Sequence, residues 1–211
     1  MVTVSHVPGV FNRAGLLDKL GVYMNATADQ IHLALEEVAR LRRLRAFDAP
    51  LSKANSAIKQ FQARRFQATY PDLLHSPRYK ASASFFLYEL YSDKDYAERD
   101  QQFARIASTI ARLFPQAVTN TAAALVKVHA LTERLDDAMA RQYLILQTSE
   151  PGMSETALYI ACWRLVADTE TRLQQLNVVL ALGQSLNDLT RKPGLRMLLK
   201  MMRGPAAAAG L

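Results

Sequence analysis

The sequence predicts an all-α protein, a single bundle of about seven or eight helices. Apolar residues recur every three or four positions along most of the chain, and no segment shows the alternation typical of a strand. Half of the 211 residues are hydrophobic, so the chain buries a core without disulfide bonds. Its single cysteine, Cys162, excludes an internal disulfide framework and a cysteine-rich zinc site.

The first quarter of the chain is expected to hold an irregular arm and two helices. Residues 1–25 are interpreted as the arm, and the bundle domain as residues 26–190. Thr27 and Gln30 fit a capping box, so the first helix is predicted to start there and to end near residues 47–50. The second helix is predicted over residues 51–69, before two prolines that mark a loop.

The segment 79–91 is apolar nearly all round, which is typical of a helix buried on several sides. We therefore expect it to be the central helix of the bundle. Its aromatic side chains are candidates for lining an internal pocket: Phe85, Phe86, Tyr88 and Tyr91.

Arg99 is the most informative charged residue of the next predicted helix, residues 96–114, which stops at Pro115. A buried guanidinium needs a charged partner, and Asp95 or Asp93 is the nearest choice. The pair is interpreted as a structural clamp, and the alternative is an anion anchor inside the bundle. Arg99 falls on a predicted apolar seam: Tyr96, Arg99, Phe103, Ile106, Ile110 and Leu113.

The C-terminal half is predicted to contain two helices within residues 116–147, with a break before Thr132. Ser154 then opens a long helical pattern through residue 189, with a bend expected near residues 168–169. Pro193 and Gly194 end this pattern, and a short helix is predicted over residues 195–203.

The charge is unevenly distributed, with net +6 over residues 1–80, −4 over 81–190 and +5 over 191–211. This asymmetry favours an anionic partner such as a membrane surface or nucleic acid. Several arginines form a candidate basic patch for phosphates, although cations near a helix C-terminus are also favoured by the helix dipole. The candidate patch comprises Arg40, Arg42, Arg43, Arg45, Arg64 and Arg65.

The tail, residues 191–211, is cationic, amphipathic and rich in methionine. It is interpreted either as a helix docked on the bundle or as one that binds an anionic membrane or a partner groove. Its candidate contact residues are Arg196, Lys200, Arg203, Met201 and Met202.

Catalytic and phosphate-binding motifs are missing, and we expect no metal site and no cofactor. Asp29, His32 and Glu36 lie on adjacent turns, and we interpret them as a capped, solvated helix start, with a metal-ligand set as the weaker alternative. Cys162 is interpreted as a buried structural thiol. His129 is interpreted as a core or boundary histidine, with an axial haem ligand as the weaker alternative.

Residues 85–106, FFLYELYSDKDYAERDQQFARI, resemble the motif FF-x-x-x-LY-x-x-x-D-x-x-x-RD of an uncharacterised bacterial family of helical proteins. The segments 131–139, LTERLDDAM, and 191–211 are similar to that family too. The resemblance implies an all-helical domain of unknown function and brings no catalytic residues with it.

Together these observations predict a non-enzymatic interaction or regulatory module that binds a protein or an anionic partner. The alternative is a binder of a lipid, fatty acid or haem, with Arg99 as the anion anchor. Self-association is compatible with either function. With one cysteine and no secretory signal, the cytoplasm is the expected compartment.

Overall fold

The computed structural model describes residues 13–90, 92, 94–166 and 169–208, and over these residues the chain is helical with no strand. The predicted all-α class is therefore confirmed. The helices are, in chain order, α1 (Arg13–Ala46), α2 (Ala49–Thr69), α3 (Pro71–His75), α4 (Lys80–Phe85), the π-helical turn η1 (Phe86–Leu90), α5 (Ala97–Leu113), α6 (Gln116–Ser149), α7 (Glu155–Leu165), α8 (Thr169–Arg191) and α9 (Leu195–Ala208).

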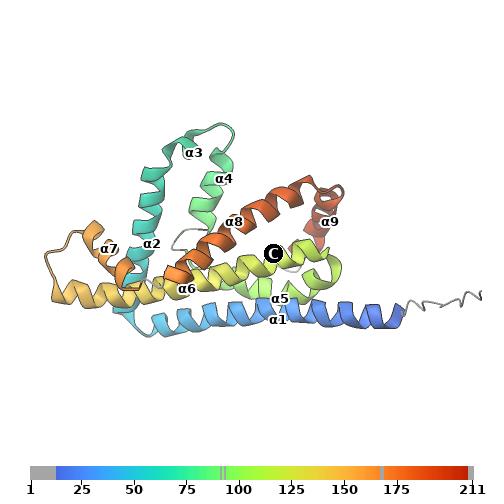
Figure 1. Cartoon of the computed structure of the whole chain (residues 1–211), viewed down its shortest axis with the longest axis horizontal. Coiled ribbons are helices and arrows are strands. Elements are labelled where there is room, and N and C mark those ends of the chain that lie inside the picture. Colours follow the sequence, from blue (N-terminus) through green and yellow to red (C-terminus); the bar gives the residue numbers. More distant parts are fainter. Residues whose placement is uncertain (1–12, 91, 93, 167–168, 209–211) are drawn as a thin grey trace, which may run out of the picture.

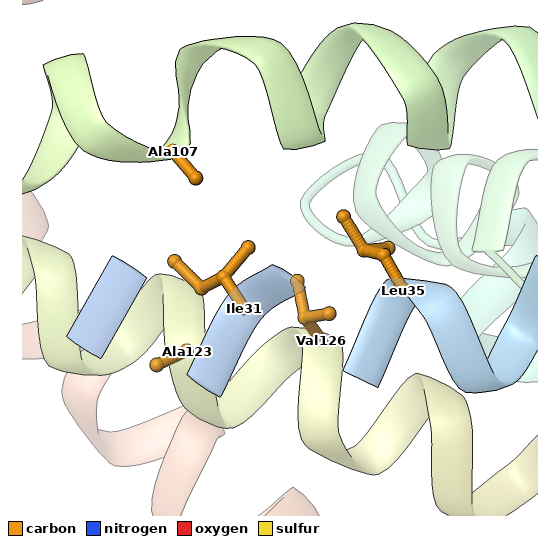
Figure 2. Packing of buried hydrophobic residues seen from close by; sticks show 5 residues of the cluster. All are labelled: Ile31, Leu35, Ala107, Ala123 and Val126. Atoms are coloured by element: carbon orange, nitrogen blue, oxygen red, sulfur yellow. The ribbon is translucent and has the colours of Figure 1, made fainter. Parts of the chain in front are cut away.

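The base of the molecule is a layer in which the two longest helices, α1 and α6, run side by side and α5 packs on α1 (Figure 1). Small side chains allow these helices to approach closely. Ile31 and Leu35 of α1 meet Ala107 of α5 and Ala123 and Val126 of α6 in a buried cluster (Figure 2).

A second core lies where α2 and α7 pack on the C-terminal half of α6. Ile58 of α2, Met139 of α6 and Leu158 and Tyr159 of α7 form it, together with Cys162, which has no exposed surface. Burial raises the pKa of the Cys162 thiol, which fits the predicted structural role of this residue.

The helix boundaries correct the sequence prediction in the first helix and within α6. The first helix begins at Arg13, so Thr27 lies inside α1 and residues 13–25 are not irregular. Gly15 and Gly21 disfavour a helix by only about 1 kcal/mol each relative to alanine. Residues 1–12 of the predicted arm lie outside the described residues. The predicted break before Thr132 is also wrong: its hydroxyl donates to the Val128 carbonyl within an uninterrupted α6.

The segment 79–91 is not the central helix. It forms α4 and η1, which stand with α2 and α3 away from the basal layer (Figure 1). Phe85 is 57% exposed and Tyr88 is also exposed, whereas Ala83 and Leu87 are buried. This short segment is covered mainly on one side, so its aromatic content does not lead to burial. The central element is α6, which packs against α1, α2, α7 and α8.

The seam predicted for residues 96–114 is rotated in the structure. Asp100, Ala107 and Ala111 are the buried positions of α5, and Leu113 is exposed. The alanines permit a closer approach to α1 than the larger residues of the predicted seam would. Arg99 consequently lies outside the buried face.

The predicted helix end at Pro115 and the predicted helix start at Ser154 are confirmed. α5 ends just before Pro115, and the Ser154 hydroxyl caps α7 by accepting from the backbone N of Ala157 at 3.3 Å. The bend expected near residues 168–169 falls between α7 and α8, and residues 167–168 lie outside the described part. Gly194 between α8 and α9 has a φ of +81°, a conformation that favours glycine.

Candidate functional site

The C-terminal half of α6 carries three buried acidic residues, Glu133, Asp136 and Asp137, which we call the α6 acidic cluster. Their spacing of three and four residues places them on one side of the helix. Because buried charges are expensive without partners, the basic and polar groups around them determine how α1 and α2 dock on α6.

Glu133 joins three helices. Its carboxylate accepts from Arg45 Nη2 of α1 at 2.6 Å and from Lys59 Nζ of α2. Burial raises the pKa of Glu133, but Lys59 and Arg45 outweigh that effect and lower the pKa to about 2. The carboxylate is therefore charged throughout the physiological pH range.

The two aspartates of the cluster have different environments. Asp137 accepts a hydrogen bond from Arg141 Nε at 3.0 Å, and its Oδ1 lies 3.5 Å from Arg45 Nη1. Asp136 accepts from the Gln62 amide of α2 at 3.0 Å, and burial raises its pKa despite the nearby Lys59 charge. One face of α6 thus holds a strongly ionised glutamate beside an aspartate that resists ionisation.

A second ionic centre surrounds Asp100 of α5. Its Oδ2 lies 2.9 Å from Arg42 Nη1 of α1 and 3.3 Å from His129 Nε2 of α6, and its Oδ1 lies 3.3 Å from Arg99 Nη2. Burial raises the pKa of Asp100, but His129, Arg42 and Arg99 together lower it. Asp100 therefore connects α1, α5 and α6.

Arg99 Nη2 lies 3.3 Å from Oδ1 of the neighbouring Asp100. Its guanidinium lies 3.9 Å from the centre of the Tyr96 ring, and its side chain is 45% exposed. Asp95 accepts instead from the backbone N of Ala97, and Asp93 lies outside the described residues. The exposure corrects the prediction of a buried clamp on an apolar stripe.

The predicted basic patch is divided among separate contacts. Arg45 and Arg42 serve the two ionic centres, and Arg40 pairs with Glu37 on α1. The remaining members point to different neighbours: Arg64 pairs with Glu155, Arg65 lies over the Tyr159 ring and Arg43 is exposed. Carboxylates already occupy most of these arginines, which argues against a phosphate-binding surface here.

The predicted pocket aromatics do not converge on a cavity. Phe85 and Tyr88 are exposed, Phe86 packs on Phe66 with ring centres 5.3 Å apart, and Tyr91 lies outside the described residues. A shallow hollow of about 360 Å³ lies nearby on α2. Its lining is Gln62, Arg65, Phe66, Thr69 and Tyr70.

The other candidate ligands also have ordinary surroundings. His129 Nε2 faces Asp100, which leaves no free Nε2 for a haem iron. Within the described residues, no group of three or more histidine, cysteine or acidic side chains is arranged to hold a metal ion. None of the described helices has the length and apolar character needed to cross a membrane.

Helix α8 is apolar on two sides. Leu182 and Leu189 are buried on the same stripe of α8 as Gln175, which donates to Thr132 of α6. The outer side, which we call the α8 leucine face, carries exposed residues at spacings of three and four: Leu173, Leu176, Leu180 and Gly183, flanked by Val179. The outer leucines are about half exposed.

The predicted tail residues lie on α9, which packs on α8. Arg196, Lys200, Arg203 and Met201 are exposed, and the side chain of Met202 is outside the described residues. Helix α9 runs to Ala208, past the end expected at residue 203.

Sequence reasoning missed the α6 acidic cluster and the α8 leucine face. Both had a signal: Glu133, Asp136 and Asp137 share one helix face, and Leu173, Leu176 and Leu180 lie opposite the buried Leu182 and Leu189. At 3.6 residues per turn these leucines form two apolar stripes on opposite sides of α8. Each stripe is a candidate for contact with another helix.

Residues 41–211 match a family described as a domain of unknown function (DUF8198). The chain belongs to this family. The match includes both ionic centres, α8 and the tail, so the tail is part of the family domain. No curated protein and no solved structure matches the chain.

Proposed function

We propose that this DUF8198 protein is a non-enzymatic interaction module that binds a helix of a partner protein on the α8 leucine face. The observation that carries the proposal is the second apolar side of α8. Covering the exposed halves of three leucines contributes about 3 kcal/mol, a useful share of a specific interaction.

The surroundings of this face suit a partner helix. Gly183 lies in line with the leucines, and nothing is within 4 Å of the place where a Cβ would be. A partner backbone can approach closely at that point. The inner side of α8 is held on α6, where Gln175 donates to Thr132 at 2.8 Å, so the face is presented on a fixed support.

Site-specific photocrosslinking in cells tests the proposal. A photoreactive phenylalanine derivative replaces Leu176, and a control replaces Gln101, an exposed residue of α5. The proposal predicts one discrete adduct from position 176 that position 101 does not give. An adduct of twice the 23.6 kDa chain mass identifies the partner as a second copy.

Matched substitutions establish which surface is responsible. Leu173→Asp with Leu180→Asp is expected to abolish the adduct from position 176. Leu33→Asp with Leu113→Asp, at exposed leucines of α1 and α5, is expected to preserve it. The proposal is refuted if position 176 gives no discrete adduct, or if both pairs act alike while circular dichroism shows both folded.

A further inference from the structure

We infer that α9 forms a docking surface for an anionic lipid bilayer, a binding site separate from the α8 leucine face. Residues 191–211 contain five basic residues and no acidic one. Three of these bases, Arg196, Lys200 and Arg203, are exposed on α9 and form no ion pair within the described part of the chain. Their charge is therefore available to an external anion.

Two exposed apolar side chains lie beside the bases. Met197 and Met201 are 68% and 70% exposed and are one helical turn apart. Arg196 and Lys200 precede them by one residue each, which places a methionine stripe next to a basic stripe along the helix. Both stripes are open to solvent, so a flat surface can contact them at the same time.

This combination fits a lipid surface better than other anions. Anionic headgroups attract lysine and arginine, and flexible apolar side chains enter the boundary between headgroups and acyl chains. A nucleic-acid backbone offers the charge but no apolar layer for the methionines. Sequence-tolerant nucleic-acid surfaces use stacking aromatics, and α9 has no aromatic residue.

Helix α9 packs on α8 and lies toward the side of the molecule opposite α7 (Figure 1). The bases concentrated in the tail contrast with the net charge of −4 over residues 81–190. The tail itself has no acidic residue that would oppose an anionic surface.

Vesicle flotation with the full chain tests the inference. Vesicles of phosphatidylcholine alone are compared with vesicles that contain about 30% phosphatidylglycerol. We expect binding only to the anionic vesicles, and a loss of binding as the salt rises from about 50 to about 500 mM. The variant Arg196→Gln/Lys200→Gln/Arg203→Gln is expected to bind about 100-fold more weakly, at roughly fivefold per base.

A charge-matched control separates α9 from net charge. Arg43→Gln/Lys53→Gln/Arg105→Gln removes the same charge from exposed sites on α1, α2 and α5, and is expected to bind as the wild type does. Met197→Ser/Met201→Ser is expected to weaken vesicle binding while leaving weak binding to a single-stranded oligonucleotide unchanged. Circular dichroism confirms that each variant is folded.

Three outcomes overturn the inference. The first is the absence of binding to anionic vesicles at low salt. The second is an equal loss in the two charge triples, which would mean that total charge alone matters. The third is oligonucleotide binding as tight as vesicle binding and sensitive to the α9 bases but not to the methionines, which would identify a nucleic-acid surface instead.

Discussion

Replacing Glu133 with Gln removes one charge from the centre of the fold while preserving the side-chain shape. Glu133 is buried on α6 and accepts hydrogen bonds from Arg45 of α1 and Lys59 of α2. In the variant Lys59 loses its carboxylate partner, and Arg45 keeps only Asp137, whose Oδ1 lies 3.5 Å from its Nη1. Leaving a buried charge without its partner is strongly destabilising.

The pKa of Glu133 gives the magnitude and the pH dependence. A fall from 4.5 to about 2 on folding corresponds to about 3 kcal/mol in favour of the charged form. Because the folded-state pKa is the lower one, this stabilisation is fully present above about pH 4.5 and disappears as the pH falls toward 2. Glu133→Gln is therefore expected to lower the free energy of unfolding by about 3 kcal/mol at pH 7, and by much less near pH 2.

Urea unfolding followed by circular dichroism measures this effect at a series of pH values. Glu37→Gln is the matched control because it makes the same change in a surface pair with Arg40, where a loss below about 0.5 kcal/mol is expected. A loss below about 1 kcal/mol for Glu133→Gln at pH 7, or a loss of the same size at pH 2, would refute the assigned role of the cluster.

Further expectations concern neighbouring groups. Asp136→Asn is expected to keep or increase stability at pH 7, because the raised pKa of Asp136 means that ionisation opposes folding above its normal pKa of 3.8; a loss comparable to that of Glu133→Gln in urea would contradict this. Arg99→Met is expected to cost less than about 1 kcal/mol in thermal unfolding, because the side chain is half exposed and Asp100 retains Arg42. Cys162 is expected to react with a thiol reagent only on unfolding; rapid labelling of the native protein would show that α7 opens.

The helices that the sequence predicted well are those bounded by strong local signals. Proline stops the α5 pattern and a serine hydroxyl caps α7, and both signals act within a few residues. The prediction at Thr27 failed because a capping sequence is also compatible with a helix interior when the preceding residues are helical. The exposure of residues in the segment 79–90 was not predictable from its apolar composition, because burial depends on which other helices cover the segment.

For the ionic centres, too, the local charges could be predicted from the sequence, whereas their pairing could not. That the arginines at the end of α1 carry excess positive charge was visible in the sequence, and so were the acids of α6. Which base meets which acid depends on helix packing: Arg45 and Glu133 are 88 positions apart. A pattern of like charges along one helix therefore suggested an external anion, whereas the fold supplies internal carboxylates instead.

The pairing of α1 with α6 also affects the order of events during synthesis. Ile31 and Leu35 lie against Ala123 and Val126, which leave the ribosome about 90 residues later. At roughly 5–20 residues per second, the buried face of α1 therefore stays without its α6 partner for about 5–18 s. During that interval the nascent helix presents apolar residues that a chaperone or another nascent chain can bind, and the basal layer closes only when the first turns of α6 have emerged.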